Sequence, residues 1–212
     1  MQQAKGPTLQ GDRGLSQKSP EPGNASYYYS LTRLLTDGTL TVNGTPYKVN
    51  GLSWMDHEFS TSALSANAVG WDWFALQLDN NREIMLYQIR NKDGTFVSTS
   101  HGTLINADGS ATHLELKDFK IEVANRWTSP HTGAAYPSSW KLTIQAPTGP
   151  IALDVTPLMA DQELNSTTAY WEGASKMTGT DGSQQVQGYG YVELTGYNRQ
   201  PDRAEPLTRQ GQ

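Results

Sequence analysis

The chain has 212 residues, of which 36% are hydrophobic and 17% are charged. This length can bury one sizeable core, whereas 16 Lys and Arg against 21 Asp and Glu give a net charge of −5 that disfavours nucleic-acid binding through phosphate neutralisation. The lack of cysteine excludes a disulfide framework, a thiol nucleophile and a cysteine-ligated metal site, and no apolar run approaches the roughly 20 residues of a membrane helix.

Both ends of the chain are polar. Residues 1–24 are punctuated by Gly and Pro, which is typical of an inter-domain linker or edge segment. Residues 198–212 contain Pro201 and Pro206 and have little to pack with, so we expect a disordered tail. Residues 25–197 are predicted to form one domain.

Strand-length segments alternate with turn dipeptides through this domain, which predicts antiparallel strands joined by hairpins. The turn signals are Asp37-Gly38, Asn43-Gly44, Asn50-Gly51, Asp93-Gly94, Asp108-Gly109 and Asp181-Gly182. The expected strands are 27–35, 39–42, 47–59, 71–78, 83–90, 95–105, 112–124, 139–145, 151–157, 169–178 and 185–197. About ten strands at this spacing favour an all-β barrel that is closed or nearly closed, with a short helix at most, in 61–69.

The strand at 47–59 carries the first candidate site. Side chains alternate along a strand, so Trp54, Asp56 and Glu58 share one face while His57 and Phe59 share the other. Asp-His-Glu is therefore no compact metal triad, and we expect no metal site. The face is either solvated, where most carboxylates lie, or turned into an aromatic cavity, where desolvation raises carboxyl pKa values and allows acid catalysis.

The next strand places Trp71 and Trp73 on one face and Asp72 and Phe74 on the other. Both faces carry apolar bulk, so we expect burial on both sides. The two tryptophans are either core residues or the lining of a pocket for an apolar or conjugated ligand.

Further aromatic residues with polar tips gather at 27–30, 170–173 and 189–197. Packing alone would be served by Leu, Ile and Val, so this enrichment points to an amphipathic cavity, although β-propensity favours the same residues. Arg33 and Arg90 end strands in an arginine-poor core. They could pair with Asp56, Glu58, Glu172 or Glu193, and such buried pairs are usually structural.

Several motifs are missing from the sequence. It has no nucleophile elbow, no phosphate-binding glycine loop and no dinucleotide fingerprint, which disfavours serine-hydrolase and nucleotide chemistry and leads us to expect no cofactor. A glycan-active protein would need two carboxylates, such as Glu58 and Glu172, about 5–9.5 Å apart across a cleft.

Segments 51–59, 70–74, 136–140, 170–173 and 188–197 together resemble the AttH/CrtC lipocalin-like family, over about residues 8–197. The resemblance implies a lipocalin-like β-barrel in a protein of two tandem barrels, often periplasmic or secreted. This chain is similar to the second barrel, so the first is expected as a missing partner. The start of the chain lacks the apolar stretch of a signal peptide, which favours a trimmed chain.

Members of this family include carotenoid 1,2-hydratases, pericyclase relatives and secreted hydrolases. In the hydratases an acid protonates an alkene and water captures the cation, so the resemblance implies that Asp56 is the proton donor. Tyr27 and Tyr29 stand at the upstream family positions of His and Trp, and Trp54 stands where Tyr is expected. The candidate catalytic residues are Asp56, Glu58 and Tyr29; the candidate ligand-binding residues are Trp54, Tyr27, Trp71, Trp73, Arg90, Trp171, Glu172 and Tyr191.

Two functions remain open at this stage. The barrel could bind or process a small hydrophobic molecule of isoprenoid or polyketide type, by hydratase or lyase chemistry with Asp56 as the acid. Alternatively, it could be a non-catalytic ligand-binding or domain-packing module, with Trp54, Trp71 and Trp73 in its core or interface. In either case the surface facing the absent barrel would be exposed, which predicts self-association.

Overall fold

The computed structural model describes residues 1–60, 64–165 and 169–198. These residues form fifteen strands, paired only in antiparallel fashion, and one 3-10 turn, which confirms the prediction of an antiparallel all-β protein with little helix. In chain order the elements are β1 (Gln2–Gln3), β2 (Thr8–Leu9), β3 (Leu15–Gln17), β4 (Ala25–Val42), β5 (Thr45–Phe59), β6 (Ala68–Leu78), β7 (Glu83–Asn91), β8 (His101–Ile105), β9 (Ala111–Glu115), η1 (Leu116–Asp118), β10 (Phe119–Thr128), β11 (Ala135–Ala146), β12 (Gly149–Pro157), β13 (Glu163–Asn165), β14 (Ala169–Asp181) and β15 (Gln184–Thr195).

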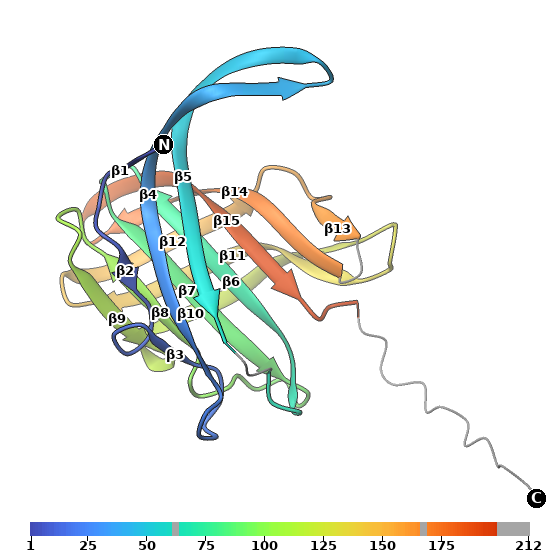
Figure 1. The fold of residues 1–212 in the computed structure, drawn as a ribbon. Helices are drawn as coiled ribbons and strands as arrows, with labels where there is room; N and C mark the ends of the chain where they lie inside the picture. The colour runs from blue at the N-terminus through green and yellow to red at the C-terminus, as the bar shows by residue number, and fades with distance from the viewer. Residues whose placement is uncertain (61–63, 166–168, 199–212) are drawn as a thin grey trace, which may run out of the picture.

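Ten strands form one large, curled sheet in the order β10-β11-β12-β14-β15-β6-β7-β8-β9, with β13 paired to β14 (Figure 1). Its concave face holds the main core. Phe74 of β6 and Trp140 of β11 are separated by three strands, yet their ring centroids lie 5.5 Å apart because the sheet bends back on itself. Large side chains such as Trp140 and Trp171 fill this interior.

A second sheet of five strands lies against the opposite face of the large one. Its centre is β4, which pairs with β1, β2 and β3 on one side and with β5 on the other. A separate apolar cluster joins the two sheets, with Tyr28 from β4 packed among Met85, Tyr87 and Ile89 of β7. Trp71 and Trp73 pack on this cluster while Phe74 lies in the main core, so β6 is covered on both faces, as predicted.

The prediction of one closed barrel is wrong, because the described residues form two sheets. The outer strands β9 and β10 are linked through η1 and share no ladder, so the large sheet stays open. The curled sheet fills its own interior with side chains, and the first five strands pack on its outer face instead of completing it.

The N-terminal segment of the chain is part of the small sheet. Residues 1–24, expected as a linker or edge segment, supply β1, β2 and β3, and Thr8, Gln10 and Ser16 within them are buried. The expected disordered tail, 198–212, lies outside the described residues except for Asn198.

The turn at Asn43-Gly44 is confirmed, with φ of 47° and 81°, values that glycine and asparagine tolerate best. Asp37-Gly38 and Asn50-Gly51 form no turns, because they lie opposite each other inside the long β4–β5 ladder. The predicted short helix at 61–69 lies partly outside the described residues, and 64–67 are not helical.

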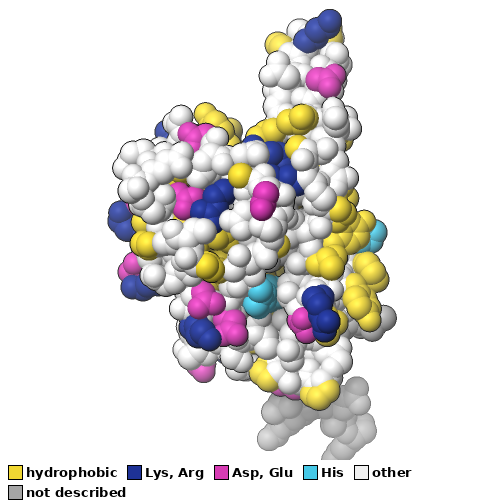
Figure 2. Space-filling model, turned by 90° about the vertical axis from the view of Figure 1, so that its left-hand side faces the viewer, with side chains coloured by type: hydrophobic (Ala, Val, Ile, Leu, Met, Phe, Trp, Pro, Cys, Tyr) yellow, Lys and Arg dark blue, Asp and Glu magenta, His cyan; other side chains and the backbone are white. Residues whose placement is uncertain are grey.

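The β4–β5 hairpin extends beyond the large sheet and beyond the rest of the small one (Figure 1). Its outer half, residues 36–51, is mostly exposed on both faces. In the space-filling view it stands out from the body, with hydrophobic side chains gathered at its base (Figure 2). An isolated two-stranded hairpin is marginally stable in water, so this half depends on the anchored base of its two strands.

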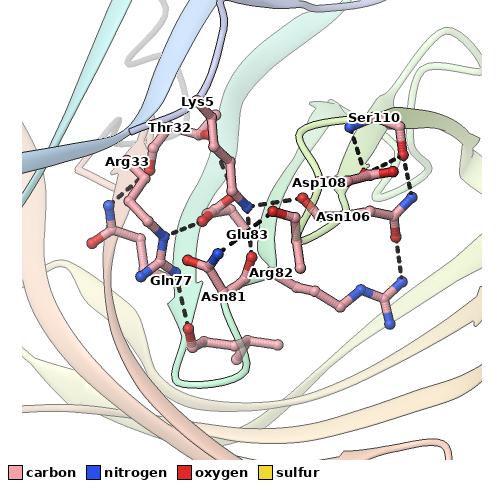
Figure 3. A network of polar contacts seen from close by, with 12 residues as sticks. Lys5, Thr32, Arg33, Gln77, Asn81, Arg82, Glu83, Asn106, Asp108 and Ser110 are labelled. Carbon is pink, nitrogen blue, oxygen red and sulfur yellow. Dashed lines mark hydrogen bonds and ion pairs between the residues drawn. The ribbon is translucent and has the colours of Figure 1, made fainter. Parts of the chain in front are cut away.

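A buried ionic cluster fastens the small sheet to the large one (Figure 3). Glu83 of β7 is fully buried and accepts hydrogen bonds from the Nζ of Lys5, at 2.7 Å, and from the Nε of Arg33. Lys5 also donates to the carbonyl of Asn106 at 2.8 Å, and Arg33 donates to the carbonyl of Leu78 at 2.9 Å. Arg33 therefore pairs with Glu83 and with none of the four carboxylates proposed from the sequence.

Candidate functional site

The candidate site is a pocket between the small sheet and the outer face of the large one, with a volume of about 480 Å³. Tyr28, Trp71, Trp73, Tyr87 and Ile89 give it an aromatic and apolar wall. The charged groups that line it are Asp56, Glu58, Glu193 and Lys18, and Ser26, Ser60 and Leu64 complete the lining. An apolar hollow with a few convergent polar groups is the usual form of a small-molecule site.

Asp56 lies on β5 opposite Ser30 of β4. Ser30 Oγ and, at 2.9 Å, Trp54 Nε1 donate hydrogen bonds to Asp56 Oδ1. The carboxyl is open to solvent through the pocket, but protein surrounds its other sides, and this burial raises the pKa of Asp56. The hydrogen bonds from Ser30, Trp54 and Tyr28 oppose that rise in pKa and fix the carboxyl in place.

Of the three consecutive tyrosines of β4, Tyr28 is the one that faces the pocket. It pairs with Glu58 across the sheet, and its hydroxyl accepts a hydrogen bond of 3.2 Å from Trp73 Nε1. Burial, together with the nearby charge of Asp56, raises the pKa of Tyr28 well above its usual value. The phenol therefore keeps its proton and can donate it in a hydrogen bond to Asp56 or to a ligand.

Glu193 enters the pocket from the large sheet. Trp71 Nε1 donates a hydrogen bond of 2.8 Å to its Oε1. Burial raises the pKa of Glu193, and the charges of Glu172, Asp56 and Glu58 raise it further. Two carboxyl groups with raised pKa values thus line the same hollow.

Lys18 closes one side of the pocket with an ion pair to Glu58, which also accepts a hydrogen bond from Ser26 Oγ. The Nζ of Lys18 lies 4.6 Å from the ring centroid of Tyr87 and 5.6 Å from that of Tyr28. Burial lowers the pKa of Lys18, while the pairing with Glu58 opposes that shift. The pocket thus already holds one cation between aromatic rings and a carboxylate.

Behind Lys18 lies a buried histidine. His101 Nδ1 is 3.1 Å from the carbonyl of Thr99, so Nδ1 donates and the neutral ring presents Nε2 to Ser16 Oγ at 3.5 Å. Burial is the main cause that lowers the pKa of His101 from 6.5 to about 4; the charges of His113 and Lys18 act in the same direction, and the hydrogen bond to Thr99 opposes them. His101 is therefore neutral at physiological pH.

This shift predicts acid sensitivity of the fold. Because the folded pKa of His101 lies below the unfolded value, the unfolded chain takes up the proton first as pH falls from 6.5 to about 4. We expect His101 to contribute a loss of roughly 3 kcal/mol in unfolding free energy across that window. Urea unfolding at several pH values should give a smaller loss for His101→Gln than for the wild type, and equal losses in the two proteins would contradict the assignment.

The structure brings five of the sequence-predicted residues together. Asp56, Glu58, Trp71 and Trp73 line the pocket, and Trp54 packs edge-on against Trp73 with ring centroids 6.4 Å apart. They meet because Trp54, Asp56 and Glu58 do share one face of β5, and that face is turned toward the large sheet.

The other predicted residues lie elsewhere. Tyr27 and Tyr29 point to the outer face of the small sheet, where Tyr27 packs on Phe59 and Tyr29 stacks on His57. Trp171 is buried in the main core.

Arg90 and the remaining two predicted residues belong to the large sheet. Arg90 pairs with Asp72 at 3.1 Å and stacks over the Tyr197 ring at 3.9 Å, so it meets none of the carboxylates proposed for it. Glu172 accepts a hydrogen bond of 3.2 Å from Tyr191. Glu172 is the cross-strand neighbour of Glu193 but is not part of the pocket lining.

Sequence reasoning missed Tyr28, Lys18 and Tyr87 as pocket residues and considered Glu193 only as an arginine partner. Tyr28 could have been found from register, because the face that Asp56 occupies alternates through Tyr28 and Ser30 on the neighbouring strand. Lys18 carried no signal, because it lies in the segment taken for a linker.

Two kinds of feature do not occur in the part of the chain that the structure describes. Within it, no group of three or more His, Asp or Glu side chains could hold a metal ion. Nor does that part contain a helix with the length and apolar character needed to cross a membrane.

Known proteins resemble this chain over most of its length. A family model described as AttH-like matches residues 1–197. Kievitone hydratase of Fusarium solani subsp. phaseoli is 26% identical over 176 residues, which cover 80% of this chain and 49% of that protein.

Solved structures are similar to this chain as well. A crystal structure described as an AttH of Nitrosomonas europaea has a TM-score of 0.84 and 35% identity, and the match covers 93% of this chain and 60% of that one. Kievitone hydratase of Nectria haematococca has a TM-score of 0.72 and 22% identity, covering 91% of this chain and 58% of that one, and this likeness concerns the fold. The chain thus spans about half the length of the curated relative.

Proposed function

The chain belongs to the AttH-like family, and from this premise we propose that its pocket binds a small apolar unsaturated molecule and adds water to an alkene. The kievitone hydratase of Fusarium solani subsp. phaseoli supports a hydratase-type reaction. The isoprenoid or polyketide character of the substrate rests on the aromatic walls of the pocket.

Asp56 is the proposed acid. The observation that carries this role is the Asp56 carboxyl, which Ser30 and Trp54 hold at an aromatic hollow and whose pKa is raised by burial. Its proton would pass to one alkene carbon, leaving a carbocation on the other. Water then forms the new C–O bond to that carbocation. The proton that this water loses returns the Asp56 carboxylate to its acid form, so atoms and charge balance.

The direct test is to incubate the purified chain with kievitone and with a small panel of prenylated compounds. We expect a product that has gained the mass of one water, detected by liquid chromatography and mass spectrometry. Native mass spectrometry of freshly purified protein should also reveal a co-purified hydrophobic molecule. A chain that binds panel members but converts none would favour the non-catalytic binding module instead.

We also propose that the chain self-associates through the β4–β5 hairpin, with a second copy as the occupant. Within the described residues β5 pairs only with β4, so its other edge is unpaired. The hairpin exposes Leu40 and Tyr47, which face each other across the two strands, and residues 34–55 contain only two charges, Asp37 and Lys48. Such an edge can pair with its own copy about a twofold axis.

Light scattering tests this association. We expect a dimer that dissociates in the double variant Leu40→Lys, Tyr47→Lys, because lysines on an edge strand repel their copies and oppose pairing. Leu158 is equally exposed outside the hairpin, so Leu158→Lys is the matched control and should remain dimeric. A strictly monomeric wild type at high concentration would contradict the proposal.

A further inference from the structure

We infer that the pocket is selective for organic cations, and that Glu193 and the indole of Trp71 form the subsite that receives the positive charge. The ligand class is an apolar or aromatic body that carries an ammonium or an equivalent carbon-centred cation. This inference rests on the proposed function and deepens it, because protonation of an alkene places a positive charge in this hollow.

The balance of charges in the pocket is the first argument. Asp56, Glu58 and Glu193 contribute three carboxyl groups, against one ammonium, that of Lys18. Lys18 is already paired with Glu58. No ion pair of Asp56 or Glu193 occurs within the described part of the chain, so these two carboxyls have no cationic partner there.

The surrounding rings are the second, independent argument. Trp71 and Trp73 line the pocket beside Glu193, and the indole is the ring that attracts a cation most strongly. The pocket itself provides an example, since the Nζ of Lys18 lies 4.6 Å from the Tyr87 ring centroid and contacts Glu58. A ligand cation at Glu193 would repeat that arrangement, with Trp71 in place of Tyr87 and Glu193 in place of Glu58.

The hydrogen bond from Trp71 Nε1 fixes Glu193 for this role. The bond of 2.8 Å holds Glu193 Oε1, and within the described residues no side chain donates a hydrogen bond to Oε2 of this pocket-lining group. Burial and neighbouring carboxylates raise the pKa of Glu193 and of Asp56, so a bound cation would lower both. Cation affinity should therefore increase with pH as the two groups lose their protons.

Two probes of nearly equal shape separate the contribution of charge to the binding affinity from that of apolar contact. Benzyltrimethylammonium carries a permanent charge, and neopentylbenzene has carbon in place of its nitrogen. Binding is followed by quenching of tryptophan fluorescence in the full chain at two pH values. We expect the ammonium to bind about tenfold more tightly than the hydrocarbon at pH 8 and to lose much of that advantage at pH 5.

The Glu193→Gln variant assigns the effect to this side chain. It keeps the shape and a hydrogen-bond acceptor for Trp71 but removes the negative charge. We therefore expect weaker binding of benzyltrimethylammonium, by about fivefold, with unchanged binding of neopentylbenzene. The control is Glu122→Gln, which removes an exposed carboxylate of β10 outside the pocket and should change neither affinity. Equal affinities for the two probes, equal weakening of both in Glu193→Gln, or binding of neither would overturn the inference.

The outcomes also separate this inference from the proposed function. Water addition to an alkene without any preference for the ammonium would leave the hydratase proposal intact and overturn the cation subsite. A preference that depends on Glu193, without water addition to any compound, would support the subsite and count against the hydratase.

Discussion

Replacing Asp56 with asparagine is expected to reduce water addition by at least about a hundredfold while leaving apolar ligand affinity nearly unchanged. Asparagine keeps the size of the side chain and an oxygen that can accept the hydrogen bonds from Ser30 and Trp54. It removes the acidic proton that the proposed reaction transfers to the alkene. The loss should therefore appear in kcat and not in binding.

Steady-state rates of product formation and tryptophan quenching by the same compound measure the two quantities. The matched control is Asp37→Asn, the same chemical change on the exposed outer half of the hairpin, and its rate should equal that of the wild type. A variant at position 56 that retains full turnover would remove Asp56 from the mechanism. Equal losses of turnover and affinity would instead indicate that the carboxyl serves to bind the ligand.

Glu83→Gln is expected to destabilise the fold by about 3–5 kcal/mol. Glu83 is fully buried, and the side chains of Lys5 and Arg33 are 5% and 10% exposed, so removing the one carboxylate leaves two cations unpaired in a dry environment. Glutamine preserves the volume of the side chain, so the cost comes from the lost charge. This is the largest stability effect that we expect from one isosteric substitution.

Urea unfolding followed by tryptophan fluorescence gives the difference in free energy. Glu122→Gln provides the comparison, because Glu122 pairs with Lys120 at 2.8 Å while both side chains are more than half exposed. Exposed pairs contribute about 0–1 kcal/mol, so this variant should unfold close to the wild type. Similar midpoints for both variants would show that the Glu83 cluster adds little to stability.

The Glu83 cluster also matters for the pocket. Asp56 and Tyr28 belong to the small sheet, whereas Trp71 and Glu193 belong to the large one. The hollow therefore exists only while the two sheets remain packed in this relative position. Lys5 and Arg33 anchor the small sheet to β7 a few residues from the strand positions that line the pocket. We therefore expect Glu83→Gln to weaken probe binding at denaturant concentrations where the chain is still folded.

Local sequence rules were reliable where a single element decides the outcome. The alternation along β5 placed Trp54, Asp56 and Glu58 on one face, and the two-sided apolar pattern of β6 predicted its burial between two layers. The same rules failed where elements compete. Asp37-Gly38 and Asn50-Gly51 are good turn formers, yet they pair with each other because Asn43-Gly44 closes the hairpin between them.

The sequence by itself determined the all-β class, the positions of most strands and the face of β5 that carries Asp56, because strand alternation and turn chemistry act over a few residues; its motifs indicated the family. The tertiary structure alone decided that two sheets form in place of one barrel, that Tyr28 and not Tyr27 or Tyr29 faces Asp56, and that Glu193 and Lys18 enter the same pocket. A shift of one residue in strand register exchanges the two faces of a strand, and register depends on contacts between residues far apart in the chain.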